Sequence, residues 1–423
     1  MKEIKPISSI NAKVMIPGSK SISHRALITA SLAKGESRLE RFLECEDTLY
    51  TAHALQTMGL EIDLEEKIVS VTGNGGEFSP FVGKKEIFLG NSGTSYRLLL
   101  SVAALGRGEY IFTGSSRMHS RPVLDLVRAL KALGVEAVCT EREGYPPVSI
   151  KADGIRGGRV KIPGNVSSQY ISSLLLASPY ATKDVEIEVT GSMVSKTYLD
   201  LTIDVMNNFG IEVEHDNHQY FRISAGKRYQ PRKFVIDGDV SSASYFWGAA
   251  AVTGGSVITE NIHPHDTRQG DIALLDILEQ MGCHVQREPD RVIVQGGRLR
   301  GTEVDMSAMP DMVPTLAAIA LFAVGKTNIR NVPHLRHKES DRIGDMALEL
   351  RKIGGKIEEL EDGIIIHGGD KLLGTEIDPH NDHRLAMSLA IAGLRVPGIR
   401  IKDEDCVNKS FPTFWELWNR VTS

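Results

Sequence analysis

The apolar and polar positions of this chain follow one order several times along its length. A short apolar run is followed by a turn with glycine, a cluster of small polar residues, and a stretch rich in Ala and Leu. This order predicts a strand, a turn and a helix. Four stretches show it clearly: "VMIPGSKSISHRALITASLA" (14–33), "IFLGNSGTSYRLLLSVAAL" (87–105), "VKIPGNVSSQYISSLLLAS" (160–178) and "FVIDGDVSSASYFWGAAAV" (234–252).

The turns recur at nearly equal intervals. Their glycines, Gly18, Gly90, Gly164 and Gly238, are separated by 72, 74 and 74 residues. Two weaker copies without the glycine, 304–323 and 377–394, turn near Met309 and His380, each 71 residues further on. The frequency of Gly-Ser turns would explain one copy but not six at one spacing. The sequence therefore predicts six repeats of about 70 residues.

The second half of a repeat has its own pattern. Apolar residues at i, i+3, i+4 and i+7 predict amphipathic helices in four stretches, 123–138, 198–214, 271–286 and 341–358. A glycine follows each helix, where a left-handed cap is expected, and then a strand-like run. A full repeat is thus strand-helix-strand-helix-strand-strand, and the predicted class is α/β or α+β.

The most apolar helices are expected to lie inside, wrapped by sheets. These are 25–33 and 315–323, which are apolar on most sides. A chain of 423 residues is too long for one ordinary core, so two domains are expected. Six repeats then divide naturally as three plus three.

Charge and helix starts together indicate the ligand class. A net charge of -5 argues against nucleic acid as a main partner. Each strand-turn-helix start presents free backbone N–H groups at a helix N-terminus, where an anion is favoured. If three such starts converge in each domain, they would attract small polyanions.

The remaining composition indicates a soluble cytoplasmic protein. Four separated cysteines form no C-x-x-C pair, which makes a zinc ribbon or a disulfide framework a weak explanation and favours a reducing compartment. The N-terminus "MKEIKPISSINAKV" has neither a signal nor a transit pattern, and no apolar run approaches 18 residues. We expect no membrane association.

Cationic and acid-base residues gather at the predicted helix starts. Taken singly, each has an ordinary structural explanation: a serine is usually a helix cap, and "ESDR" opening a helix compensates the dipole. Their recurrence at the turn end of the repeats favours function, because a solvated face would scatter them. The set is Lys20, Ser21, Arg25, Asn91, Gly93, Thr94, Arg97, Arg117, Arg121, Ser167, Ser168, Gln169, Ser195, Lys196, Asp311, 337–342, 381–384 and Lys409.

Several familiar sites are not supported. "HPHD" (263–266) and "HNDHR" (380–384) lack H-E-x-x-H spacing, so we expect no metal. "GSKS" has no glycine at the Walker A distance, since Lys13 stands there, and no G-x-G-x-x-G opens a βαβ unit. G-x-S-x-G, the hydrolase elbow, is absent.

The combination of motifs is specific. The chain resembles the 5-enolpyruvylshikimate-3-phosphate synthase family from end to end. The matching motifs are "PGSKSISHRAL", "LGNSGTSYR", "RMHSRPV", "VSSQY", "GDVSSASYF", "RHKESDRI", "NDHRLAM" and "KSFPTFW". The sister enolpyruvyl transferase of peptidoglycan synthesis usually has a cysteine shortly before R-P-V and K-N after its first turn. This chain has "TGSSRMHSRPV" and K-S.

The resemblance implies an arrangement of the repeats. It implies two similar domains, each of three βαβαββ units with helices inside the sheets (an inside-out α/β barrel), and an active site in the cleft between them. The first domain would be discontinuous, 1–19 plus 236–423, and the second would be 20–235.

The resemblance also implies a reaction between two anionic substrates. The enolpyruvyl group of phosphoenolpyruvate would pass to the 5-hydroxyl of shikimate 3-phosphate through a tetrahedral intermediate, with release of phosphate and with no metal or cofactor. We expect a monomer acting on small molecules. Shikimate 3-phosphate would be held by Lys20, Ser21, Arg25, Ser167, Ser168, Gln169, Ser195, Lys196, Asp311 and Lys338. Phosphoenolpyruvate would be held by Lys20, Gly93, Arg121, Gln169, Arg342, Arg384 and Lys409.

Three of these residues are expected to be catalytic. Glu339 and Lys20 would transfer the proton at the methylene carbon, and Asp311 would take the hydroxyl proton. A carboxylate among cations normally has a lowered pKa, so Glu339 would need geometry or ligand charge to act as an acid. A polyanion-binding scaffold without chemistry is the alternative, but it would gain nothing from carboxylates among its cations.

Four positions depart from the usual family pattern: Ser92, Leu98, Thr197 and His334. At His334 the resemblance implies an asparagine that contacts the shikimate phosphate. Gly93 is retained, and it leaves room for the herbicide glyphosate, so we expect sensitivity to that inhibitor.

Overall fold

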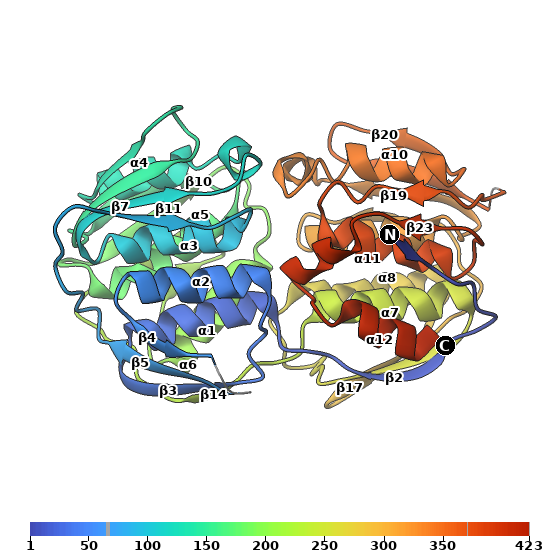
Figure 1. Ribbon diagram of the computed structural model, residues 1–423, viewed down its shortest axis with the longest axis horizontal. Coiled ribbons are helices and arrows are strands. Elements are labelled where there is room, and N and C mark those ends of the chain that lie inside the picture. Colours follow the sequence, from blue (N-terminus) through green and yellow to red (C-terminus); the bar gives the residue numbers. More distant parts are fainter. Residues whose placement is uncertain (65–67, 370, 423) are drawn as a thin grey trace. The chain divides into compact units, whose positions relative to one another are not determined.

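The computed structural model describes residues 1–64, 68–369 and 371–422. The chain divides into two compact units (Figure 1): unit 1 is Met1–Pro17 with Asp237–Ser423, and unit 2 is Gly18–Ile236. Each unit has a hydrophobic core of its own. The prediction of a mixed α/β fold is confirmed.

The second repeat shows the pattern in full. Its four strands form a sheet in the order β6-β7-β9-β8, with β6 and β7 parallel and the other pairs antiparallel. Its elements are β6 (Lys84–Phe88), α3 (Gly93–Ala103), β7 (Arg107–Thr113), α4 (Leu124–Ala132), β8 (Glu136–Cys139) and β9 (Val148–Asp153). The third repeat has the same order, β10-β11-β13-β12. Its elements are β10 (Gly158–Pro163), α5 (Ser168–Ala177), β11 (Val185–Thr190), α6 (Thr197–Asn208), β12 (Glu214–Asp216) and β13 (Tyr220–Ile223).

The first and fourth repeats take their opening strands from distant parts of the chain. β14 pairs in parallel with β3 in unit 2, and β2 pairs in parallel with β15 in unit 1. The first repeat contains α1 (Lys20–Leu32), β3 (Lys34–Glu40), α2 (Glu46–Thr57), β4 (Glu61–Asp63), β5 (Ile68–Asn74) and β14 (Lys233–Val235). The fourth contains β2 (Asn11–Met15), α7 (Val240–Thr253), β15 (Ser256–Glu260), α8 (Leu274–Met281), β16 (His284–Glu288) and β17 (Arg291–Gln295). Thus β2 leads into a helix of unit 2, and β14 leads into a helix of unit 1.

The last two repeats complete unit 1. The fifth contains β18 (Glu303–Asp305), α9 (Val313–Ala320), β19 (Gly325–Arg330), α10 (Gly344–Lys352), β20 (Lys356–Glu359) and β21 (Ile364–Gly368). The sixth contains β22 (Glu376–Ile377), α11 (His383–Gly393), β23 (Arg400–Ile401) and α12 (Phe414–Thr422). Its sheet takes β1 (Lys2–Glu3) as an antiparallel strand beside β23. The described strands form six separate sheets rather than one closed barrel.

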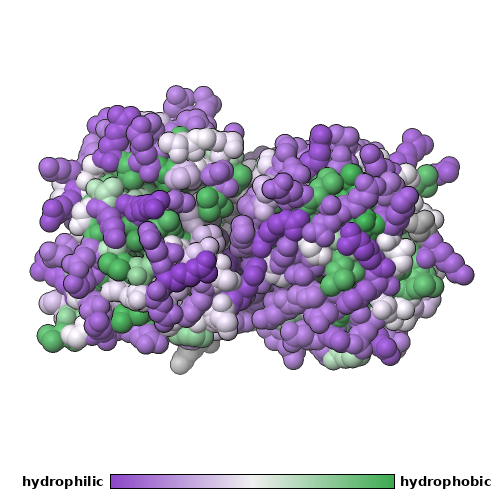
Figure 2. Space-filling view, turned by 90° about the horizontal axis from the view of Figure 1, so that it is seen from above, coloured by the Kyte–Doolittle hydropathy of each residue, from purple (hydrophilic) through white to green (hydrophobic). Residues whose placement is uncertain are grey.

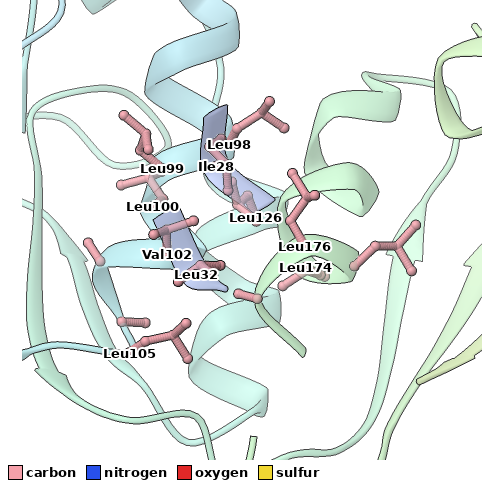
Figure 3. Close-up of a cluster of buried hydrophobic side chains, with 14 of the residues drawn as sticks. Ile28, Leu32, Leu98, Leu99, Leu100, Val102, Leu105, Leu126, Leu174 and Leu176 are labelled. Carbon is pink, nitrogen blue, oxygen red and sulfur yellow. The ribbon is translucent and has the colours of Figure 1, made fainter. Parts of the chain in front are cut away.

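The first helix of each repeat lies in a core, as the apolar pattern predicts. Every residue of α7, α9 and α11 is buried, and so is nearly all of α1. Figure 3 shows how Ile28 of α1, Leu98 of α3 and Leu174 of α5 belong to one cluster in unit 2. Full burial of such a side chain contributes about 1.5–3 kcal/mol.

The second helices end as predicted. Gly134, Gly210, Gly282 and Gly354 follow α4, α6, α8 and α10 with φ of 88°, 86°, 110° and 96°. These left-handed values confirm the predicted glycine caps, because a side chain would be strained there. On the face in Figure 2, apolar side chains form small groups separated by polar ones. Within the described residues, no helix has both the length and the apolar character needed to cross a membrane.

Candidate active site

The helix starts of the first two repeats meet in unit 2 through buried polar side chains. Lys20, the first residue of α1, places Nζ 2.9 Å from Oδ2 of Asp47 at the start of α2. His24 Nδ1 lies 2.7 Å from Thr51 Oγ1, which donates to Ser95 Oγ of α3 at 2.8 Å. The N-termini of α1, α2 and α3 therefore lie together.

The third repeat brings the start of α5 to the same end of unit 2. Gln169 donates from Nε2 to Thr94 Oγ1 (3.0 Å), and its Oε1 accepts from Arg97 Nη1 (2.7 Å). The Arg97 guanidinium carbon also lies 5.5 Å from the centre of the Tyr170 ring. The starts of α1, α3 and α5 thus lie at one end of unit 2, and helix N-termini favour anions.

Arg25 is the most deeply buried cation of this group, with 1% of its surface exposed. Its guanidinium donates to Thr202 Oγ1 (2.7 Å), the Ser21 carbonyl (2.9 Å) and the Tyr198 carbonyl (3.3 Å), and Nη2 lies 3.5 Å from Ser172 Oγ. Burial lowers the pKa of Arg25 to about 10. Among the described residues, its charge is met by hydroxyl and carbonyl oxygens, which suits a site that receives an anion.

Several of the residues predicted to bind shikimate 3-phosphate lie on the helices that contact Arg25. Ser167 caps α5 by accepting from Gln169 N, and Ser168 begins the helix that carries Ser172. Ser195, at a φ of 54°, and Lys196 come directly before α6, which carries Tyr198 and Thr202. The structure therefore brings the Ser21, Ser167–Ser168 and Ser195–Lys196 segments together.

Arg121 lies over Gly93 at the start of α3. Arg121 is 2% exposed, and its Nη1 donates to the Asn91 carbonyl at 3.0 Å and to Asn91 Oδ1 at 3.2 Å. A Cβ on Gly93 would come within 2.4 Å of Arg121 Nη2. Glycine at this position lets the guanidinium reach the helix start.

In unit 1, Arg342 is the centre of a buried charge cluster. Its guanidinium contacts three carboxylates: Nη1 donates to Asp311 Oδ1 (2.9 Å), Nη2 to Glu339 Oε2 (2.7 Å) and Nε to Asp382 Oδ2 (2.7 Å). Burial would lower the pKa of Arg342, but these carboxylates outweigh it and raise that pKa. Breaking such a buried pair by removing one partner typically costs about 3–5 kcal/mol.

Arg384 joins the same cluster from the start of α11. Its Nη2 donates to Asp311 Oδ2 at 2.7 Å, so Asp311 lies between two guanidinium groups. Burial acts to raise the pKa of Asp311, but the charges of Arg384, Arg342 and Lys338 hold that pKa well below its usual range. Asp382 caps α11 by accepting a hydrogen bond from Arg384 N at 2.9 Å. This cap fixes the backbone of Arg384 at the start of the helix.

Three further predicted or discussed residues lie near this cluster. Lys338 follows the short helix η5 (Pro333–His337), which carries His334. His334 is buried, neither ring nitrogen has a hydrogen-bond partner within the described part of the chain, and burial and Lys338 lower its pKa to about 3. Lys409 is buried at the end of η6 (Glu404–Lys409), which packs against α11.

Sequence reasoning missed Asp47 and the pair Ser241–Asp271. Ser241, near the start of α7, donates from Oγ to Asp271 Oδ2. Burial and the charge of Asp311 raise the pKa of Asp271 to about 7. Asp47 and Asp271 both stand at the start of a helical segment, where an acid looks like ordinary dipole compensation. "QGD" (269–271), just before an amphipathic helix, was the only available signal for the second.

The histidines of the two His/Asp-rich motifs, 263–266 and 380–384, include two that lie beside carboxylates. His263 Nδ1 lies 3.3 Å from Asp237 Oδ1, and His380 Nε2 lies 3.0 Å from Glu349 Oε1. Searching the described ranges finds no group of three or more His, Cys, Asp or Glu placed to hold a metal ion.

Comparison with known proteins finds similarity over nearly the whole chain. A family model described as EPSP synthase (3-phosphoshikimate 1-carboxyvinyltransferase) matches residues 4–418. Proteins named 3-phosphoshikimate 1-carboxyvinyltransferase are 43% identical in Sulfurovum sp., with 99% of both chains covered, and 45% identical in Syntrophobacter fumaroxidans, with 100% of both covered. A solved EPSP synthase from Acinetobacter baumannii has a TM-score of 0.83 at 32% identity, covering 99% of this chain and 98% of its own. This chain therefore belongs to the EPSP synthase family of 3-phosphoshikimate 1-carboxyvinyltransferases.

Proposed function

We propose that this protein transfers the enolpyruvyl group of phosphoenolpyruvate to the 5-hydroxyl of shikimate 3-phosphate and releases phosphate. Family membership supports the reaction. Within the structure, one observation carries it: Asp311 lies between Arg342 and Arg384, with Glu339 on the same Arg342. This combination offers anion binding and proton transfer in one place.

The residues around Arg25 would hold the phosphate of shikimate 3-phosphate. Ser21, Ser167, Ser168, Ser195 and Lys196 stand at or next to the starts of α1, α5 and α6, the helices that contact this guanidinium. A phosphate would supply the negative charge that the neutral oxygens around Arg25 lack, and a guanidinium binds phosphate with two parallel hydrogen bonds. Lys338 and Asp311 would hold the hydroxyls.

Phosphoenolpyruvate would be held by the remaining cations. Arg121 over Gly93 and Gln169 contribute from unit 2, and Arg342, Arg384 and Lys409 contribute from unit 1. Planar guanidinium groups suit both the carboxylate and the phosphate of this substrate.

Asp311 would take the proton of the attacking hydroxyl. In the free protein the surrounding cations lower its pKa, which makes it a weak base. Anionic substrates that bind to Arg342 and Arg384 would cancel part of this positive field and raise the pKa of Asp311. Substrate binding would thus strengthen the base when it is needed.

Glu339 and Lys20 would handle the proton at the methylene carbon. In the addition step the 5-oxygen bonds to C2 of phosphoenolpyruvate while a proton is delivered to C3, which gives a tetrahedral intermediate. In the elimination step a proton leaves the methyl group, the C–O bond to phosphate breaks and the double bond returns. Glu339 is 10% exposed and held by Arg342, and Lys20 is held by Asp47.

The proposal also covers the location, the oligomeric state and the partners of the protein. We infer that the protein acts in the cytoplasm as a monomer on these small molecules, without nucleic acid.

The decisive experiment is an assay of phosphate release from the purified protein. Release is expected with phosphoenolpyruvate and shikimate 3-phosphate together, and not with either alone. A UDP-sugar acceptor is the control, because it is the substrate class of the sister transferase. No release, or release only with the UDP-sugar, would refute the proposal.

A further inference from the structure

The start of α7 carries a buried polar pair that the reaction above does not use. Ser241 is 9% exposed and Asp271, in the short helix η3 (Gly270–Ala273), is 5% exposed. Gln269 fixes the two segments: its Oε1 accepts from Val240 N at 3.2 Å and its Nε2 donates to the Gly238 carbonyl at 2.8 Å. The pair is therefore held in place by the fold.

The pair faces Arg384. Ser241 Oγ donates its proton to Asp271 Oδ2 and lies 3.5 Å from Arg384 Nη2. A hydroxyl has one proton and two lone pairs, so donation to the carboxylate leaves only lone pairs for the guanidinium. Tyr245 OH, on the next turn of α7, lies 3.4 Å from Arg384 Nη1.

A structural role alone explains this carboxylate poorly. Burial and the nearby charge of Asp311 raise the pKa of Asp271 to about 7, while Arg384 and the Ser241 hydrogen bond act in the opposite direction. Asp239, the cap of α7, adds a further negative charge. A neutral side chain of the same size would avoid the cost of burying a carboxylate beside another.

We propose that Asp271 is a positioning residue for phosphoenolpyruvate: through the Ser241 hydroxyl, it fixes the Arg384 guanidinium beside Asp311. This rests on the proposed function, which assigns Arg384 to that substrate. The guanidinium is then held on one side by Asp311, at 2.7 Å, and on the other by α7. Its planar fork has one orientation, and binding does not have to order it.

The test is a double-mutant cycle with steady-state kinetics for both substrates. Asp271→Ala and Ser241→Ala should each raise KM for phosphoenolpyruvate about tenfold, with KM for shikimate 3-phosphate and kcat changed less than about threefold. The double variant should be no worse than either single one, because both act through one contact. Asp271→Asn, which keeps an acceptor oxygen for Ser241 but loses the charge, should have a KM for phosphoenolpyruvate between those of wild type and Asp271→Ala.

The matched control is Ser244→Ala, which removes another buried hydroxyl of α7, one that bonds to the Ser241 carbonyl and to Thr315. This control should leave both KM values near wild type. Equal rises in both KM values, additive losses in the double variant, or no rise at all would overturn the inference. If Asp271→Ala fails to fold, the comparison of Ser241→Ala with Ser244→Ala decides. A wild-type protein without phosphate release would instead refute the proposed function itself.

Discussion

At the scale of single residues, the site depends on charges whose partners come from distant segments. Arg25 contacts Thr202 and Ser172, which are 177 and 147 positions away. Motif and position indicated that Arg25, Arg342 and Arg384 are functional. No sequence pattern could show that Arg25 lies among neutral oxygens while Arg342 lies among carboxylates.

Glu339→Ala should abolish turnover while leaving shikimate 3-phosphate binding measurable. Arg342 keeps Asp311 and Asp382 as partners, so the cluster should survive, whereas the proton transfer at carbon loses its acid. Such groups typically contribute about 10²–10⁴-fold to the rate. Phosphate-release kinetics and calorimetric binding measure the two effects, with Glu358→Ala, a more exposed glutamate, as the control. Near-normal turnover in Glu339→Ala would contradict the assigned role.

Gly93→Ala should weaken phosphoenolpyruvate binding. The new Cβ would come within 2.4–2.8 Å of three Arg121 guanidinium atoms, so this side chain must move away. We expect KM for phosphoenolpyruvate to rise about tenfold, which corresponds to about 1.4 kcal/mol, and glyphosate inhibition to weaken. Kinetics with varied phosphoenolpyruvate and glyphosate test this, and an unchanged KM would show that Arg121 is not a ligand.

Asp271→Asn should change how stability depends on pH. The pKa of Asp271 is raised from 3.8 to about 7 by burial and by Asp311, so the folded state holds this proton more tightly than the unfolded state. The wild type therefore loses stability as the pH rises from about 4 to about 7, whereas the asparagine variant lacks this loss.

Between pH 5 and pH 8 the free energy of unfolding of the variant should rise by about 2–3 kcal/mol relative to that of wild type. Denaturant unfolding at both pH values measures the difference. Asp276→Asn, at a carboxylate that is 65% exposed, is the control and should show little change. A constant difference between Asp271→Asn and wild type across this range would contradict the prediction.

At the scale of elements, local signals predicted most of the fold. The 3.6-residue apolar period and the following glycine located α4, α6, α8 and α10, because amphipathicity and left-handed caps are local properties. Pairing of strands was not predictable in this way. β14 has three residues and joins β3, almost 200 positions earlier, and no local pattern specifies such a partner.

Gly238→Ala should destabilise unit 1 severely. Its Cβ would lie 2.1 Å from the Asn261 backbone carbonyl oxygen, which accepts the hydrogen bond of Gly238 N. Because the backbone cannot move away as the end of a flexible side chain can, we expect the free energy of unfolding to fall by more than about 3 kcal/mol. Thermal unfolding measures this. Gly226→Ala is the control, since its Cβ meets nothing within 4 Å and carries only the strain of a φ of 74°, about 1 kcal/mol.

At the scale of the whole molecule, the two units differ in whether their residues form one continuous segment of the chain. Unit 2 is one continuous segment, whereas unit 1 needs Met1–Pro17 in addition to the C-terminal half. That short segment supplies β1, β2 and the buried residues Ile4, Ile10, Val14 and Ile16.

A fragment of residues 18–236 should therefore fold cooperatively by itself. A fragment of residues 237–423 should be less stable, because the sheet of the fourth repeat lacks β2 and part of the core is missing. Adding the peptide 1–17 should raise its unfolding midpoint in a concentration-dependent way. Circular dichroism during heating tests both fragments. A C-terminal fragment whose unfolding midpoint does not change when the peptide is added would contradict the prediction.

The exchange of β2 and β14 also sets the order in which the protein is completed during synthesis. The partner of β2, β15, is made about 240 residues after β2 itself. At about 5–20 residues per second, β2 waits about 10–50 s for β15, while unit 2 can fold as soon as β14 has emerged. The parallel partner of β2 is therefore made only after the whole of unit 2, so the sheet of the fourth repeat cannot form before unit 2 has been translated.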